Sequence, residues 1–187
     1  MANKVIYGIC NVYYAKATDD GTGTLTYATP VHIPGARSIS LSASGDQLNW
    51  AADNVTYFSM AGDDGYEGDL TMAIIPDDFK KDILGETLDA KGFYVERSGS
   101  SKSEFALLFQ FEGDDKAVKH CLYRCTASRP AVNGNTVDGS PEPSEETITL
   151  RVMPRINDKV VKARAPYTAS TTSSYATWFS AVQEPTA

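Results

Sequence analysis

Residues 103–130, SEFALLFQFEGDDKAVKHCLYRCTASRP, decide the fold because they contain two strand-like runs joined by a charged turn. In the first run, large apolar side chains occupy alternate positions: Phe105, Leu107, Phe109 and Phe111. The opposite face carries Ala106, Leu108, Gln110 and Glu112. A period of two residues predicts a β-strand. The EGDD turn that follows, with Gly113 expected in a backbone conformation that favours glycine, predicts a hairpin.

The same period recurs along the chain between clusters of Gly, Asp, Ser and Pro. The N-terminal run has two apolar faces, so we expect cover on both: Ile6, Cys10, Val12 and Tyr14 on one, and Val5, Tyr7, Ile9 and Tyr13 on the other. Further alternating runs lie at residues 38–43, 147–152 and 161–165. We therefore predict a mainly β protein, an antiparallel β-sandwich or barrel of about eight strands.

Two segments break this period and predict flanking helices. In residues 76–85, PDDFKKDILG, Pro76 suits the first helical position and Gly85 can end the helix. Near the C-terminal end, apolar side chains recur every three or four residues, which predicts an amphipathic helix: Tyr175, Trp178, Phe179 and Val182. Such an aromatic stripe is more often core packing than a ligand site.

Length and composition favour one domain over residues 1–187. A chain of 20.2 kDa can bury about 70% of its surface on folding. Two polar segments interrupt the strands: a long loop at about residues 44–69, with a strand near residues 55–60, and a loop at about residues 133–146. The first carries Trp50 and Tyr66, which are large aromatic side chains on a segment that we expect to be exposed.

Charge and targeting signals narrow the function classes. A net charge of -7 argues against a protein that binds nucleic acid through a basic surface. The N-terminal sequence lacks a signal-peptide pattern, and no apolar run is long enough to span a membrane. We therefore expect cytosolic synthesis and no membrane partner. The three cysteines, an odd and sparse set, predict reduced thiols: Cys10, Cys121 and Cys125.

The residues that carry catalytic or metal chemistry are few. His32 fits a loop or strand edge better than catalysis, whereas His120 lies beside Cys121. In a strand, Cys121 and Cys125 would share a face about 13 Å apart, too far for one zinc ion or a disulfide. We expect buried thiols that act as small apolar groups. Since no catalytic motif is present, we predict neither an enzyme nor a cofactor or metal site.

Several blocks in order resemble the major tail proteins of long-tailed phages that infect Gram-positive bacteria, the phi13-type family. These blocks are VIYGICNVYYAK at residues 5–16, GDLTMAIIPDDFKKDILGE at 68–86, the segment 103–130, SEETITLRVMPR at 144–155 and SYATWFSAV at 174–182. The resemblance spans about residues 5–182. Some relatives carry an additional C-terminal immunoglobulin-like domain, which we do not expect here.

This resemblance implies a tail tube protein whose copies form hexameric rings that stack into a hollow tube. In such tubes, strands of neighbouring subunits join into an inner β-barrel, and a long loop with the terminal arms links one ring to the next. The implied partners are further copies of the chain, the tape measure protein, the tail terminator and distal tail or baseplate proteins. Assembly in the host cytoplasm would place the protein in the virion tail, where phage DNA passes through it.

Two groups of residues follow as candidate sites. We predict that residues 44–69 form the loop between rings, with Leu48, Trp50 and Tyr57 as its apolar anchors. An acidic lumen would repel DNA and let it slide. The candidates for that surface are Asp63, Asp64, Glu67, Asp69, Glu112, Asp114 and Asp115. Solvation on the outer surface is the equally good alternative for these acids, and the cluster at residues 63–69 lacks the spacing of a calcium-binding loop.

Two other function classes remain open. One is a different ring-forming virion protein, such as a tail terminator or a capsid decoration protein. The other is a carbohydrate- or peptide-binding β-sandwich, in which Trp50, Tyr57 and Tyr66 would form a stacking platform. Self-assembly into long tubes distinguishes the tail tube from both.

Overall fold

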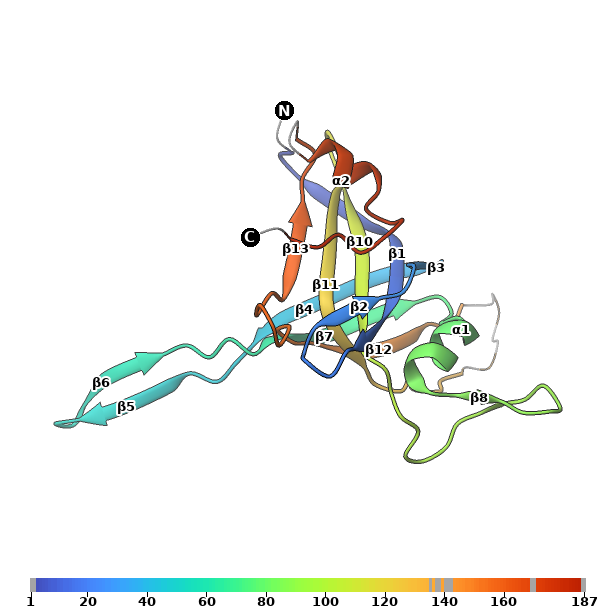
Figure 1. The fold of residues 1–187 in the computed structure, drawn as a ribbon, viewed down its shortest axis with the longest axis horizontal. Helices are drawn as coiled ribbons and strands as arrows, with labels where there is room; N and C mark the ends of the chain where they lie inside the picture. The colour runs from blue at the N-terminus through green and yellow to red at the C-terminus, as the bar shows by residue number, and fades with distance from the viewer. Residues whose placement is uncertain (1–2, 135, 137–138, 140–142, 169–170, 186–187) are drawn as a thin grey trace.

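The computed structural model describes residues 3–134, 136, 139, 143–168 and 171–185. Within these residues, nine antiparallel strands form one sheet, ordered β2-β1-β10-β11-β12-β7-β4, with β3 paired to β1 and β13 paired to β11 (Figure 1). Their bounds are β1 (Ile6–Asp19), β2 (Leu25–Tyr27), β3 (Val31–Ile33), β4 (Ala36–Ser44), β7 (Gly65–Met72), β10 (Phe105–Gly113), β11 (Val118–Ala127), β12 (Glu146–Val152) and β13 (Lys162–Ala165). The predicted mainly β antiparallel class is confirmed.

Two short hairpins lie outside this sheet. The first, β5 (Leu48–Ala52) and β6 (Val55–Met60), projects far from the body of the molecule (Figure 1). The second pairs β8 (Thr87–Leu88) with β9 (Tyr94–Val95). The predicted count of about eight strands was too low, because strands of two or three residues carry no recognisable alternation.

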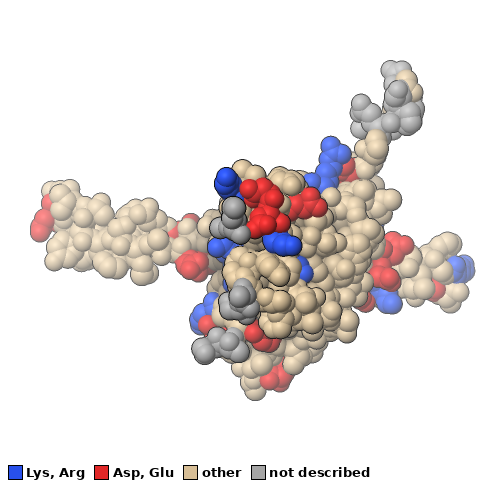
Figure 2. Space-filling model, turned by 90° about the horizontal axis from the view of Figure 1, so that it is seen from above, with Lys and Arg blue, Asp and Glu red and all other residues tan. Residues whose placement is uncertain are grey.

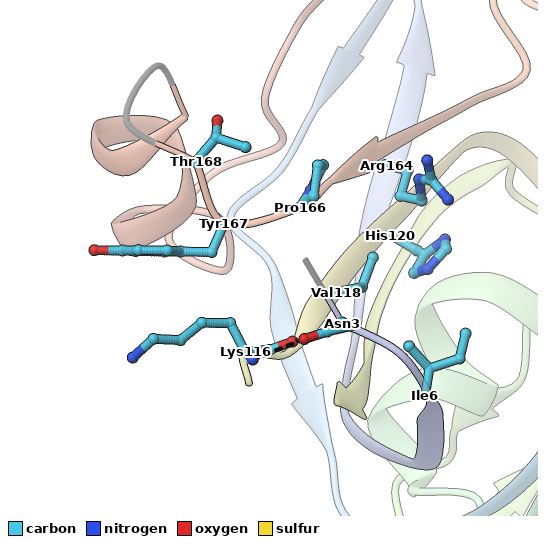
Figure 3. A pocket seen from close by; sticks show the side chains of 9 residues that line it. All are labelled: Asn3, Ile6, Lys116, Val118, His120, Arg164, Pro166, Tyr167 and Thr168. Atoms are coloured by element: carbon cyan, nitrogen blue, oxygen red, sulfur yellow. Dashed lines mark hydrogen bonds between the residues drawn. The ribbon is translucent and has the colours of Figure 1, made fainter. Parts of the chain in front are cut away.

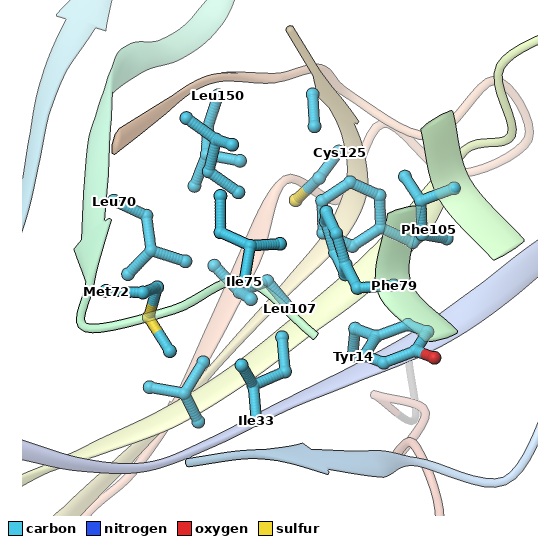
Figure 4. Close-up of a cluster of buried hydrophobic side chains, with 14 of the residues drawn as sticks. Tyr14, Ile33, Leu70, Met72, Ile75, Phe79, Phe105, Leu107, Cys125 and Leu150 are labelled. Carbon is cyan, nitrogen blue, oxygen red and sulfur yellow. The ribbon is translucent and has the colours of Figure 1, made fainter. Parts of the chain in front are cut away.

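The main core fills the concave side of the sheet, which bends so that β4 approaches β1. Figure 4 shows side chains from most of the strands meeting there, among them Leu70, Leu107 and Leu150. Helix α1 (Asp77–Phe79) and the π-helical turn Lys80–Leu84 close this core with Phe79 and Ile83. Gly85 ends the turn at φ 78°, as predicted.

A second core lies on the other face of the sheet, under the C-terminal segment. Trp178 belongs to this core together with Ala106, Leu108 and Tyr123. Helix α2 (Thr172–Ala176) is shorter than the predicted amphipathic helix, and turns follow it. Its one threonine and the flanking Thr171 and Thr177 are poor helix formers, and tertiary contacts hold the segment instead. The Tyr123 hydroxyl, for example, donates to the Gln183 carbonyl at 2.7 Å.

Irregular strand pairing overturns two of the predicted faces. A register shift between the Phe105 and Leu107 pairs places Cys125 in the main core and Cys121 in the second core, so the two buried thiols lie on opposite faces. Shifts in β1 likewise bring Ile9 against the same core as Val12. Each β-bulge inserts one residue into the alternation, which a strict period of two cannot anticipate.

Gly113 was expected to be a glycine because of a special backbone conformation, and this explanation was wrong. Gly113 does not have a positive φ; it is the last residue of β10 and pairs with Ile6. A Cβ atom there would lie 2.6 Å from the Lys116 carbonyl oxygen. Close approach of the backbone after the turn therefore requires the glycine.

We expect Phe79→Ala to lower the free energy of unfolding by about 3–5 kcal/mol, because it leaves a cavity in the main core. Phe79 is fully buried and meets Tyr14 and Phe105 edge to face. Urea denaturation measures the loss. The matched control is Phe93→Ala, at a residue that is 63% exposed, for which a change above about 0.5 kcal/mol would contradict the assignment of surface and core.

Candidate functional site

The predicted inter-ring loop, residues 44–69, extends too far, because residues 65–69 belong to β7 of the main sheet. Its remaining part contains the projecting hairpin, residues 47–61, which is stiffened by its own pairing. Asp53 and Asn54 form its tip with φ values of 53° and 60°, which suit a two-residue turn between twisted strands. Gln47 donates to Ser59, and Ser59 donates to Asn49, at 2.9 and 2.8 Å. The segment is thus a two-stranded arm rather than an irregular loop.

The arm is apolar and lies in solvent. The three predicted anchors are exposed by 54% at Leu48, 58% at Trp50 and 71% at Tyr57. Val55, Phe58 and Met60 are also exposed. Figure 2 shows the arm as mainly uncharged, with acidic atoms near its tip and its root. Exposed apolar surface of this extent is typical of a contact site.

A glycine neck joins the arm to the main sheet. A Cβ atom on Gly45 would lie 2.3 Å from the Gly62 carbonyl oxygen, and one on Gly62 would lie 2.5 Å from the Asp46 carbonyl oxygen. The Gly62 amide donates to Asp46 at 3.0 Å. Only glycine allows the two chains to approach so closely at this point.

The convex face of β4, β7 and β12 is polar, and we call it the polar face. Its side chains alternate with those of the core: Ser38, Ser40, Ser42, Glu67, Asp69, Thr71, Thr147, Thr149 and Arg151. Thr149 donates to Asp69 at 2.9 Å, and the Thr71 and Thr147 hydroxyls lie 3.1 Å apart. Most of these side chains are short hydroxyl groups, which make the face hydrophilic.

Both margins of the polar face have unpaired strand edges. Among the described residues, β4 pairs with β7 along one edge only. On the other margin, β12 pairs with β11 through Leu150–Val152, and Ser128 adds hydrogen bonds to the Thr149 amide and carbonyl. Among the described residues, this leaves 146–148 without a strand partner on that side. Free strand edges of this kind are templates for pairing with another chain.

The seven predicted acidic candidates lie in three separate places. Glu67 and Asp69 are exposed on the polar face, whereas Asp63 and Asp64 follow the neck of the arm. Of the others, Glu112 lies in the last part of β10, and Asp114 and Asp115 lie in the turn between β10 and β11. That turn leads into the start of β11, whereas β11 pairs with β12 at its other end. Within one copy, the seven acids therefore do not form one continuous surface, and which of them face a lumen stays a prediction.

A hollow of about 500 Å³, the upper hollow, lies between β1, β11, β13 and the segment after β13 (Figure 3). Ile6, Val118, Pro166 and Tyr167 give it apolar walls, and Lys116 and Arg164 give it positive charge. The adjoining start of β1 exposes Val5, Ile6 and Tyr7 by more than half. The expected cover on both faces of this run is therefore absent in one copy.

His120 also lines the upper hollow, stacked on Phe109 with ring centroids 5.2 Å apart. Burial lowers its pKa to about 4, with Arg164 and Lys162 adding repulsion. Burial also raises the pKa values of the Cys121 and Cys125 thiols. In the part of the chain that the structure describes, no three His, Cys, Asp or Glu side chains are grouped to hold a metal ion.

Sequence reasoning missed two features of these surfaces. The alternation in residues 38–43 and 147–152 indicated a wet strand face, but not that the two strands flank β7 on one surface. The upper hollow combines residues from distant segments, such as Ile6 and Arg164, and no local pattern indicates it. No described helix has the length and apolar character to cross a membrane.

These surfaces define a structural β protein, with edges and an arm available for contacts. A family model described as phage tail tube protein matches residues 2–117, and the chain belongs to this family of structural virion tail proteins. Among curated proteins, no sequence matches the chain.

Two of the solved structures that are similar to the chain come from the anti-feeding prophage. The tube-terminating cap of the anti-feeding prophage has a TM-score of 0.51 at 11% identity, covering 89% of this chain and 95% of that chain. A chain of the anti-feeding prophage baseplate has a TM-score of 0.48 at 12% identity, covering 88% and 97%. At these identities, the likeness to the cap establishes the fold alone.

The low pKa of His120 predicts a pH dependence of stability. Because its folded pKa of about 4 lies below the ordinary value of about 6.5, the unfolded chain binds the proton first. The free energy of unfolding should therefore fall as the pH drops from about 6.5 to 4. His120→Gln should lose that part of the pH dependence in urea titrations at each pH. Identical slopes for the two proteins would contradict a buried neutral histidine.

Proposed function

We propose that this chain is a phi13-type major tail protein that builds the hollow tail tube as stacked hexameric rings. The observation that carries the proposal is the polar face, which is bounded by two free strand edges and has the apolar arm at one end. The wall of a water-filled tube needs a polar surface of this kind. Each subunit of a closed ring needs two different edges, one for each of its two neighbours. The arm then extends the contact out of the ring.

Ring closure requires a heterologous contact between two different surfaces of the same chain. In our proposal, the free edge of β4 in one copy pairs with the free part of β12 in the next. The polar faces then join into one inner barrel without an exposed edge. The main core lies behind this barrel in every subunit.

The arm would provide the contact between rings. It continues β4 and β7 beyond the neck, so it leaves the subunit along the direction of the strands that form the polar face. Its exposed aromatic residues, Trp50 and Tyr57, would be buried against the adjacent ring. A two-stranded hairpin alone is only marginally stable in water, and such burial would stabilise it.

The lumen in this proposal passes DNA without binding it. The polar face carries Glu67 and Asp69 with Arg151 as its cation, and the protein has a net charge of -7. Since neutralised phosphates strengthen binding through counterion release, a surface of hydroxyls and carboxylates would keep DNA mobile. Glu67 and Asp69 are thus our lumen residues among the seven candidates.

The remaining parts of the proposal concern partners and location. The tube would form around the tape measure protein in the host cytoplasm, and it would meet the tail terminator at one end and distal tail or baseplate proteins at the other. It would then form part of the virion tail. The role is structural and needs neither catalysis nor a cofactor.

A second candidate is a ring that ends a tube. The similarity to a tube-terminating cap supports it, but such a ring would not stack into long tubes. The carbohydrate-binding alternative has less support, because Trp50 and Tyr57 meet edge to face at 84° and Tyr66 lies in β7, where its ring contacts Lys162. These rings do not form one flat platform.

Replacing residues 47–61 by Asn-Gly should leave a folded protein that cannot stack. The Asp46–Gly62 hydrogen bond would then close a short turn at the neck. Negative-stain microscopy at high protein concentration should show tubes for the unchanged protein and none for the variant, while the thermal unfolding of the monomer stays within a few degrees. Tubes of normal length from the variant would overturn the role of the arm.

Reversing charge on the polar face should make the tube retain DNA. For Glu67→Lys with Asp69→Lys, we expect tubes that hold duplex DNA at low salt and release it at high salt, because the new cations displace counterions. The matched control is Glu112→Lys with Asp114→Lys, which has the same change of charge at the turn between β10 and β11. Retention by the control alone would move the lumen to that turn.

A further inference from the structure

The arm and its neck carry only negative charge. Between residues 44 and 64, the chain has four aspartates and no lysine or arginine: Asp46, Asp53, Asp63 and Asp64. Asp53 stands at the tip, and the nearest large apolar residues along the chain, Val55 and Trp50, are exposed. Any surface that receives the tip must therefore combine apolar walls with positive charge.

The upper hollow has this combination. Its described lining includes the cations Lys116 and Arg164 and no carboxylate. Arg164 is exposed on β13, and no ion pair of either cation occurs within the described part of the chain. Ile6 and Tyr167, both about half exposed, form its apolar rim. His120 stays neutral near pH 7 because burial lowers its pKa to about 4, so it adds no charge.

The other large hollow has the opposite character. It lies beside Ile74 and the start of β12, and its single described cation is Lys80. Four carboxylates line it: Glu86, Glu96, Glu145 and Glu146. Glu146 lies 3.5 Å from Lys80, Glu145 pairs with Arg37 at 2.9 Å, and Glu96 pairs with Arg129 at 2.5 Å. The described lining therefore offers an acidic tip no cation that lacks a carboxylate partner. Charge therefore distinguishes the two hollows as receivers of the arm.

The arm cannot reach the upper hollow of its own chain. The arm points away from the body of the molecule, whereas the hollow lies on that body, between β1, β11 and β13 (Figures 1 and 3). A contact between them must join two copies. Since the two surfaces differ, the contact is heterologous and can repeat from copy to copy.

We propose that the tip of the arm docks in the upper hollow of a second copy, where Asp53 pairs with Arg164 and the apolar side chains of the arm cover Ile6 and Tyr167. This inference rests on the proposed function for the existence of an assembly, and it specifies the surface that receives the arm. Complementary charge fixes the orientation of the arm in this contact and disfavours docking in the hollow beside Ile74.

A charge exchange tests the pair. Arg164→Glu should raise the protein concentration at which assemblies appear about tenfold or more, since like charges in a contact are costly. Asp53→Asn, which keeps a residue that tolerates the positive φ at the tip, should weaken assembly to a smaller degree. Combining Asp53→Lys with Arg164→Glu should restore assembly toward that of the unchanged protein. Lys91→Glu, an equal change on an exposed loop, is the matched control and should have no effect.

Disulfide capture tests the location independently. In a Cys10→Ser background, Val55→Cys with Ile6→Cys should give a ladder of covalently linked chains under mild oxidation. Val55→Cys with Ile74→Cys, at the acidic hollow, is the control and should stay monomeric on a denaturing gel. A ladder from the Ile74 variant and none from the Ile6 variant would overturn the proposal.

The two tests also separate this inference from the proposed function. If the unchanged protein forms no tubes or rings at any concentration, the proposed function fails. If tubes form, and the armless variant does not stack, but Arg164→Glu behaves like Lys91→Glu, then the arm binds elsewhere and only the docking site is wrong.

Discussion

The ladder between β4 and β7 is the interaction on which the other surfaces depend. Leu70 is almost fully buried and pairs with Ile39 on one side and Ile148 on the other. A Cβ atom on Gly68 would lie 1.9 Å from the Ser40 carbonyl oxygen, so the two strands approach closely only with glycine. This ladder supplies one wall of the main core, the middle of the polar face and the root of the arm. A change that separates β4 from β7 would therefore disturb all three together.

Much of the fold could be predicted because alternation is a local property. The faces of residues 105–111 and 147–152 are as expected, since those strands pair without irregularity over most of their length. The faces around Ile9 and Cys125 were wrong because a bulge depends on the partner strand, which a single strand does not encode. The C-terminal helix was overestimated for a related reason. The apolar spacing that predicts a helix is also satisfied by turns that place Trp178 and Phe179 on a sheet.

The candidate sites were predictable only where exposure follows from position in a loop. Leu48, Trp50 and Tyr57 belong to a segment that was expected to be exposed, and the structure places them on the arm. The seven acids could not be sorted from the sequence, because Asp63 and Glu67 are close along the chain but lie on different surfaces. The upper hollow was not predictable at all. Its walls are set by the pairing of β1 with β10 and of β11 with β13, and both pairings join distant segments.

The distribution of charge reconciles a net charge of -7 with assembly. At physiological ionic strength the Debye length is about 8 Å, so repulsion between whole subunits is largely screened, whereas charges in direct contact still interact. Contacts between copies are then selected by local complementarity rather than by net charge. The arm is acidic, and the polar face is mixed, with Arg151 opposite Glu67 across the ladder. The upper hollow is apolar, and the charged side chains in its described lining, Lys116 and Arg164, are both positive. Net repulsion then favours dispersed subunits, and the contact between the arm and the upper hollow has to supply the attraction locally.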